Sequence, residues 1–336
     1  MNKEYLNYIN NFRGFVIILI VGVHCLSSQL LQWTSSSDTR YFLHSLLHGS
    51  SVFYIFIAGF LFQFLIDKYN YFDYLSQKFK FILLPYLFLS VPAILDEIYS
   101  PKEIYASLPV WKQVLIYYST GIHMSHFWFI PMILIYYLIS PIFVIINKNY
   151  KNYLVIPFLM ILTVIIPREI SPVHNPFLSG MHFLGFYVFG MWISCRRKEI
   201  LNLSNYYFYG FILFVIIFFC SWIMSFYQNK SEYFLQFLYV IKFSVMCVVI
   251  LMFFYKYDQK MGRAMNFLAA PSFGIYFLHN YLIVLGEKIL MRMNIQIEGG
   301  LVKFGVSIIL VTVLSYFLVR LTKMMLGKSS KIFIGC

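Results

Sequence analysis

The chain has 336 residues, of which 60% are hydrophobic, 21% aromatic and only 12% charged, and its mean hydropathy is +0.74. This composition excludes an ordinary soluble domain and indicates a polytopic membrane protein. The formal net charge of +13 does not indicate a nucleic-acid partner, because the Lys and Arg residues are scattered between long apolar runs rather than gathered on one polar face.

Apolar runs of about 15 to 24 residues predict about ten transmembrane helices. Backbone amides in lipid need internal partners and the runs do not alternate as barrel strands do, so we expect an all-α membrane bundle. The fifth and sixth runs are short, and a re-entrant pair is the alternative there. We expect one integral membrane domain over 1–336, with a core at 10–326 and no separate soluble domain. The predicted spans are 14–32, 46–65, 79–95, 127–146, 152–167, 182–196, 207–227, 234–255, 268–289 and 302–325.

The distribution of basic residues predicts the orientation of the chain. With the N-terminus in the cytoplasm, 17 of the 26 Lys and Arg residues fall in inner segments. This asymmetry favours cytoplasmic placement of both termini. The five cysteines lie in the predicted spans or at their inner ends, where neither a disulfide framework nor a metal site is expected.

Two polar residues mark the first predicted span. Arg13 and His24 are eleven positions apart, which on a helix is about 1100° of rotation and about 16 Å of rise, so the two side chains share a face. A histidine deep in lipid costs folding energy and suggests chemistry. His279 lies at a similar depth in the ninth predicted span, and the two histidines could face one cavity. The alternative is that either one simply hydrogen-bonds a neighbouring helix.

Three lysines lie in or at the edges of predicted spans. Lys78 and Lys80 open the third predicted span on the same side as Arg13, where they either snorkel to the interface or form a basic mouth for phosphates. Lys242 lies about 12 Å in from the outer end of the eighth span. It either snorkels, pairs with Glu287 or contacts a polar substrate, and the sequence leaves the three open.

The segment HFWFIP, residues 126–131, follows a long outer connection. His126 and Trp128 could roof a cavity, in which an aromatic face would receive a carbohydrate. The alternative for Trp128 is an aromatic belt at the lipid boundary.

Five strings in chain order together resemble the acyltransferase-3 family of bacterial membrane proteins. They are the Arg13 to His24 spacing, FYIFIAGFLF (53–62, with Ala58 where serine is usual), QKFKFILLPYL (77–87), HFWFIPMILIYYLISP (126–141) and SFGIYFLHN (272–280). The family often has an Arg-x-x-Arg pair before the third span, whereas here Lys78 is followed three residues later by Phe81. The resemblance is therefore carried to Lys78, with Lys80 as a substitute for the second arginine.

The resemblance implies an acyl-CoA-dependent O-acetyltransferase of the bacterial cytoplasmic membrane. Its acyl donor would be acetyl-CoA, with no metal, and its acceptor a hydroxyl of an envelope carbohydrate such as O-antigen, capsule or exopolysaccharide, or a lipid-linked precursor. By this analogy His24 is the catalytic histidine and Arg13 lies near the CoA entrance.

The predicted mechanism combines the resemblance with the spacing. Arg13, Lys78 and Lys80 would bind the CoA phosphates, and His24 would act as general base on the sugar hydroxyl. His279, Ser272 or Tyr276 would orient the base or stabilise the oxyanion. A covalent acyl-histidine step, succinyl instead of acetyl transfer, and a glycan or lipid flippase are the alternatives left open. Lipid is the other expected partner, and the sequence predicts no oligomeric state.

Overall fold

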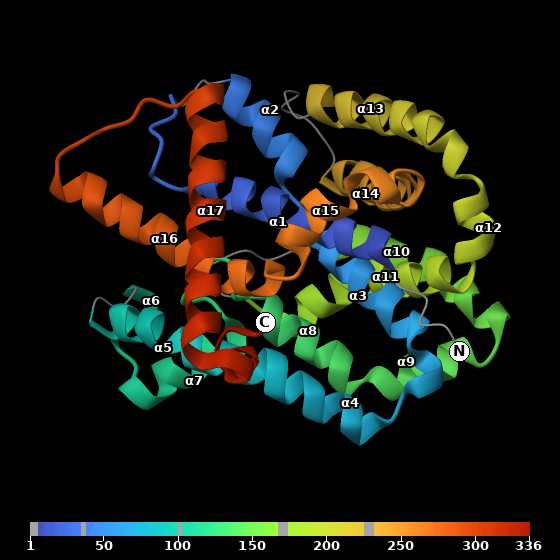
Figure 1. Cartoon of the computed structure of the whole chain (residues 1–336), viewed down its shortest axis with the longest axis horizontal. Coiled ribbons are helices and arrows are strands. Elements are labelled where there is room, and N and C mark those ends of the chain that lie inside the picture. The colour runs from blue at the N-terminus through green and yellow to red at the C-terminus, as the bar shows by residue number, and fades with distance from the viewer. Residues whose placement is uncertain (1–5, 35–37, 100–102, 167–173, 225–231) are drawn as a thin grey trace.

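The computed structural model describes residues 6–34, 38–99, 103–166, 174–224 and 232–336 (Figure 1). Regular structure in these ranges is helical, apart from one isolated parallel bridge between Gln32 and Glu298. The prediction of an all-α fold is confirmed. Four of the Lys and Arg residues used to predict the orientation lie outside the described residues. They are Lys3, Lys102, Arg168 and Lys230.

The helices of the first half include three pairs in which one element follows another directly. They are α1 (Asn7–Ser27), α2 (Asp38–Leu47), α3 (Ser51–Phe64), η1 (Ile66–Lys68), α4 (Tyr71–Lys78), η2 (Phe79–Leu83), α5 (Leu84–Tyr99), α6 (Glu103–Ala106), α7 (Val110–Thr120), α8 (Phe129–Leu138), α9 (Ser140–Asn147), η3 (Tyr150–Val155) and α10 (Ile156–Ile165).

The second half includes the two longest helices of the described chain, α14 (Glu232–Lys256) and α17 (Leu301–Leu326). Its other elements are α11 (Pro176–Cys195), α12 (Arg197–Asn202), η4 (Ser204–Tyr206), α13 (Tyr207–Met224), α15 (Asp258–Ala269), α16 (Ser272–Arg292), η5 (Gly327–Ser329) and α18 (Ser330–Ile334).

All ten predicted spans contain helix, but not all are long and apolar enough to cross a bilayer. Six helical segments of the described chain meet that condition, and α8 with α9 is a seventh if this pair, bent by 56°, counts as one span. The segments Tyr150–Ile165 and Ser204–Cys220 are shorter. In α16, polar residues such as His279, Asn280 and Glu287 interrupt the apolar run. The structure therefore supports six or seven spans and does not confirm ten, nor the cytoplasmic placement of the termini.

Helix α1 lies at the centre and packs against α2, α3, α14, α15, α16 and α17 (Figure 1). It begins at Asn7 rather than at the predicted residue 14. The first turns of α1 are polar, and one of their side chains is paired with a neighbouring helix, since the Asn11 side-chain amide donates to Asp258 at 3.0 Å. It ends at Ser27, because Ser28 is extended and its hydroxyl donates to the Cys25 carbonyl at 2.8 Å.

The second predicted span is broken between α2 and α3. Gly49 has φ +96°, and a Cβ there would lie 2.7 Å from the Tyr239 ring, so the break requires glycine. The buried Lys242 ammonium donates to the Ser45 carbonyl at 3.2 Å, close to the C-terminus of α2. A cation at a helix C-terminus is favourable, and here it also satisfies a carbonyl inside an apolar region. The Ser45 carbonyl is therefore a structural partner of Lys242, which the sequence analysis did not predict.

Helices α3 and α11 pack with their backbones in close contact. A Cβ on Gly59 would lie 1.9 Å from the Tyr187 carbonyl oxygen, and one on Gly190 would lie 2.1 Å from the Phe56 carbonyl oxygen. Small residues of this kind allow membrane helices to pack backbone to backbone, which gains dispersion contacts that lipid cannot replace.

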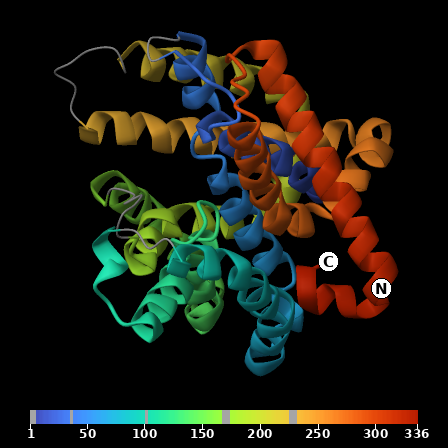
Figure 2. The same cartoon turned by 90° about the vertical axis from the view of Figure 1, so that its left-hand side faces the viewer.

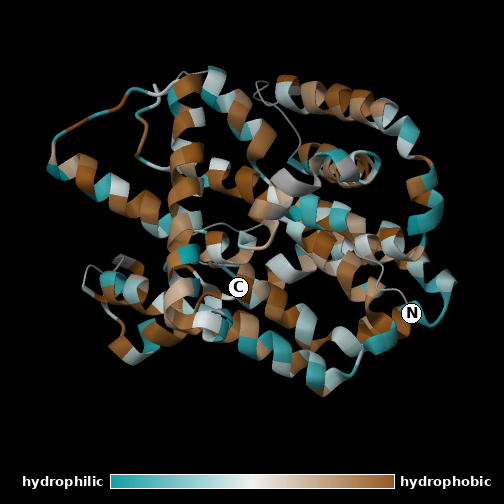
Figure 3. Ribbon diagram, viewed as in Figure 1, coloured by the Kyte–Doolittle hydropathy of each residue, from teal (hydrophilic) through white to brown (hydrophobic). Residues whose placement is uncertain are grey.

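The outer surface is apolar where a bilayer would cover it. Figure 3 shows hydrophobic residues along α17, whose Val302 and Met324 are 81% and 75% exposed. Figure 2 shows α17 running along the outside of the molecule. Apolar exposure on this scale is expected of a lipid-facing helix.

We expect Gly190→Ala to destabilise the protein by about 1 to 3 kcal/mol, because the added methyl group forces α3 and α11 apart. Gly305→Ala on α17 is the matched control, since nothing lies within 4 Å of a Cβ there. The measurement is the thermal unfolding midpoint in detergent. Equal midpoints for the two variants would contradict the packing argument.

Candidate functional site

Two cavities lie on either side of a group of aromatic side chains. The larger has a volume of about 940 Å³, and His24, Ser125, His126 and Trp128 are part of its lining. The smaller has a volume of about 520 Å³, and Arg13, Lys68 and Lys78 are part of its lining. Their linings share three residues, Tyr54, Phe129 and Tyr276.

Three imidazoles meet at the inner end of the larger cavity. His24 comes from α1, His126 from the loop before α8, and His279 from α16. The ring centroids are 5.1 Å apart for His24 and His279, 5.9 Å for His24 and His126, and 4.7 Å for His126 and His279. In the part of the chain that is described, no group of His, Cys, Asp or Glu is arranged to hold a metal ion.

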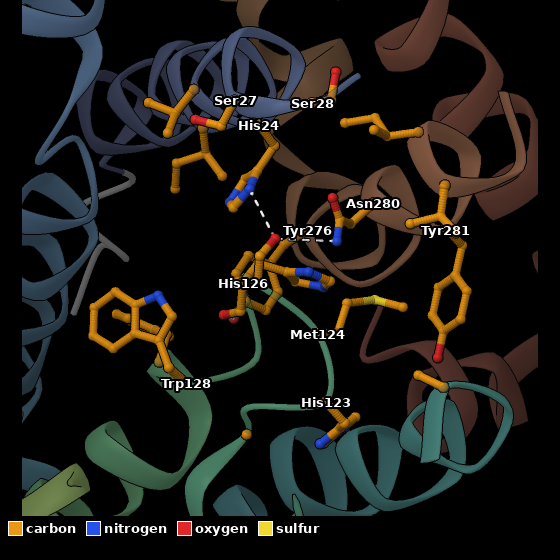
Figure 4. Close-up of a pocket in the computed structure, with 18 of the residues that line it drawn as sticks. His24, Ser27, Ser28, His123, Met124, His126, Trp128, Tyr276, Asn280 and Tyr281 are labelled. Carbon is orange, nitrogen blue, oxygen red and sulfur yellow. Dashed lines mark hydrogen bonds between the residues drawn. The ribbon is translucent and has the colours of Figure 1, made fainter. Parts of the chain in front are cut away.

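His24 is the member of this cluster that opens most to the cavity. Its side chain is half-buried and lines the larger cavity, whereas His126 is 2% exposed and His279 is fully buried and lines neither cavity. Figure 4 shows the His24 ring pointing into the space above His126. A molecule in the larger cavity therefore reaches His24 directly and His279 only through its neighbours.

His279 is fixed in one tautomer by the backbone of its own helix. Its Nδ1 lies 2.7 Å from the Tyr276 carbonyl oxygen and 3.1 Å from that of Ile275, so this nitrogen carries the proton and donates. The Nε2 atom is buried and has no hydrogen-bond partner among the described residues. In the neutral ring Nε2 is an acceptor, so it does not donate to an oxyanion as one of the predicted roles requires.

His126 lies outside the membrane-spanning helices and is held neutral by its surroundings. Burial lowers the pKa of His126 well below the usual imidazole range, and the nearby His279 and His24 lower it further. Its backbone carbonyl accepts a hydrogen bond from the Tyr276 hydroxyl at 2.5 Å. His126 thus contributes an uncharged ring to the cavity and an anchor for Tyr276.

Ser125 and Asn280 form a hydrogen-bonded chain to His24. The Asn280 side-chain amide donates to Ser125 Oγ at 3.2 Å, and Ser125 Oγ lies 3.2 Å from His24 Nδ1 (Figure 4). When Ser125 accepts from His24 Nδ1–H, the basic lone pair of the neutral imidazole is on Nε2. The chain therefore fixes the orientation of the ring.

Arg13 and His24 share a face of α1, as the spacing predicted. Arg13 donates to Ser272 Oγ at 3.3 Å and His24 lies against His279, and both partners are on α16. Ser272 in turn donates to the Ala269 carbonyl at 2.8 Å. The two side chains nevertheless open into different cavities, Arg13 into the smaller and His24 into the larger.

The two predicted lysines separate. Lys78 lines the smaller cavity, where its ammonium lies 5.0 Å from the Tyr74 ring centroid and 4.9 Å from that of Tyr137. Lys80 is exposed, lies over the Phe81 ring, and lines neither cavity. The structure instead brings Lys68 into the smaller cavity.

Trp128 and Tyr276 both line the larger cavity. The Trp128 ring stacks on Phe183 at 5.7 Å and contacts His174 at 5.6 Å. The Tyr276 ring stacks on Phe273 at 5.9 Å. These contacts hold both aromatic faces at the cavity wall.

Sequence reasoning did not identify Ser125, Asn280 or Tyr54. Ser125 directly precedes His126 and Asn280 directly follows His279, and this adjacency was the available signal. The contact between Ser125 and His24 joins residues 101 positions apart, and that between Asn280 and Ser125 joins residues 155 positions apart. Local patterns do not report contacts at such separations.

The fold and the site together define a class of protein. It is a multi-pass membrane protein whose helices surround a basic cavity and a histidine-lined cavity. The chain matches the family model described as an acyltransferase domain over residues 6–320, and it belongs to this family, acyltransferase-3. The protein is therefore a membrane acyltransferase. Comparisons with curated proteins and with solved structures gave no significant match.

We expect Ser125→Ala to lower the rate constant of acyl transfer about three- to tenfold, because one hydrogen bond that orients His24 is lost. The apparent affinity for the acyl donor should not change, and the pH profile of the rate should shift with the freed imidazole. Ser125→Thr, which keeps the hydroxyl, should restore the rate, and Ser119→Ala on α7 is a serine control outside both cavities. A weaker donor affinity with an unchanged rate constant would contradict this role.

Proposed function

We propose that the protein is an O-acetyltransferase of the bacterial cytoplasmic membrane. It transfers an acetyl group from acetyl-CoA to a hydroxyl of a cell-envelope polysaccharide or of its lipid-linked precursor. The observation that carries the proposal is the pair of cavities, one basic and one lined by His24, which meet at shared side chains. Such an arrangement suits two substrates that differ in charge and arrive separately.

The smaller cavity suits the phosphates of the donor. Arg13, Lys68 and Lys78 supply three cations, and an acid, Asp73, is also in the lining. Arg13 uses one N–H on Ser272, and the guanidinium has further donors for a phosphate oxygen. The lysines add positive charge without fixed bidentate geometry.

The larger cavity suits a carbohydrate. Its lining includes the carboxylates of Asp96, Glu97 and Glu287 and the aromatic face of Trp128. Carboxylates accept hydrogen bonds from sugar hydroxyls, while a few polar groups among apolar walls fix the orientation of a ligand. Asp96 is itself positioned by Lys288, whose ammonium lies 3.0 Å from its carboxylate.

His24 acts as the general base in this proposal. Its Nε2 takes the proton of the acceptor hydroxyl as the hydroxyl oxygen bonds to the thioester carbonyl carbon, and the imidazolium then returns the proton to the sulfur as the carbon–sulfur bond breaks. Ser125 and Asn280 hold the His24 ring in place, and the proposal requires the tautomer in which Nδ1–H donates to Ser125 Oγ. His279 packs behind the ring and limits its movement.

We expect His24→Gln to lower acyl transfer by about 100-fold or more, the usual range for loss of a general base. Cys25→Ala is the matched control, because Cys25 is the next residue on α1, is buried and lines neither cavity. The measurement is release of CoA by purified protein supplied with envelope glycans, with the unfolding midpoint recorded for each variant. Normal transfer by a folded His24→Gln protein would refute the mechanism.

We expect Lys78→Ala to raise the Michaelis constant for acetyl-CoA about tenfold or more, since a charge-assisted contact to phosphate is worth about 1.5 to 3 kcal/mol. Arg13→Ala should act in the same way. Lys80→Ala, two positions along the chain and outside both cavities, should leave this constant within about twofold. Equal effects of the Lys78 and Lys80 substitutions would place the donor elsewhere.

A further inference from the structure

The two cavities are separated by an aromatic wall made of Tyr54, Phe129 and Tyr276. These are the residues that both linings share, and each carries an aromatic ring. Arg13 and Lys78 lie on one side of the wall and His24 on the other. Under the proposed function the thioester must therefore pass the wall before His24 can act on the acceptor.

Two members of the aromatic wall are held by hydrogen bonds. The Tyr276 hydroxyl donates to the His126 carbonyl at 2.5 Å, and its ring packs against that imidazole at 5.0 Å. The Tyr54 hydroxyl donates to the Arg13 carbonyl at 3.4 Å. Moving either tyrosine out of the way would cost a hydrogen bond in a region shielded from water.

Phe129 is the remaining member, and its side chain has no polar atom. It is the first residue of α8 and is half-buried. Its ring contacts are to Tyr276 and Trp128, both at 6.0 Å between centroids. Rotation of this side chain breaks no hydrogen bond, and its cost is the loss of packing against the two main clusters of buried hydrophobic residues.

We propose that Phe129 is the movable ring of the aromatic wall and that it sets which acyl group crosses. The inference rests on the proposed function and adds the acyl class. A small uncharged acetyl group passes a partly rotated ring, whereas a longer chain requires more displacement of a packed interior. A succinyl carboxylate would lose hydration against aromatic faces without a charged partner in the wall, which is costly.

The closed wall also separates the donor thioester from water in the larger cavity. If Phe129 is removed, a water oxygen can bond to the thioester carbonyl carbon while the carbon–sulfur bond breaks, with one water proton transferred to the sulfur. The products are a carboxylic acid and free CoA. Release of CoA by hydrolysis of the thioester, measured without acceptor, therefore indicates that the aromatic wall is open.

The test compares wild type, Phe129→Ala, Phe129→Leu and Phe129→Trp in lipid nanodiscs. The donors are acetyl-, butyryl-, hexanoyl- and succinyl-CoA, and release of CoA is measured with and without envelope glycans. We expect Phe129→Ala to raise the ratio of butyryl to acetyl transfer about tenfold or more and to increase acceptor-free hydrolysis. Phe129→Leu should give an intermediate change, and Phe129→Trp should slow butyryl transfer more than acetyl transfer.

Phe127→Leu is the matched control, because Phe127 lies two positions away and lines neither cavity. It should keep the wild-type ratio of donors. Wild-type ratios and wild-type hydrolysis in folded Phe129→Leu and Phe129→Ala proteins would overturn the role of Phe129 while leaving the proposed function intact. Failure of the wild-type protein to consume any of the four donors would instead overturn the proposed function.

Discussion

Polar side chains inside an apolar bundle need partners, and contacts between α1 and α16 supply part of them. Arg13 donates to Ser272 at one end of the shared face, and His24 packs on His279 and reaches Asn280 through Ser125 at the other. Unpaired, such groups would carry a large desolvation cost in lipid. Paired, they fix the register of the two helices, so the contacts that stabilise the fold also position the site.

The same constraint explains irregular backbone elsewhere in the bundle. Helix α2 ends inside the protein at Leu47, where the buried Lys242 ammonium satisfies the Ser45 carbonyl and Gly49 takes a left-handed conformation. Non-helical backbone at membrane depth is tolerated where it is buried in protein or lines a cavity. Gly49 itself lines the larger cavity, so the break contributes to the space in which we place the acceptor.

Two cavities that share three aromatic side chains give this architecture two separate compartments. Under the proposed function, a charged donor would occupy one compartment and a polar acceptor the other. His24 would then lie on the acceptor side, away from the donor phosphates. The chain belongs to the acyltransferase-3 family, which makes acyl transfer the activity that the two cavities have to serve.

The sequence by itself determined the helical class, the membrane character, the family and the shared face of Arg13 and His24, because composition, hydropathy and the 3.6-residue period are local properties. It did not determine the lengths of the helices, since Asn11 and the residues around it look polar until Asp258 is placed beside them. It ranked Lys78 above Lys80, but it did not show that only Lys78 lines the smaller cavity while Lys80 is exposed. Only the tertiary structure placed Ser125 and Asn280 beside His24 and set an aromatic wall between the cavities, because these contacts join segments that lie far apart in the chain.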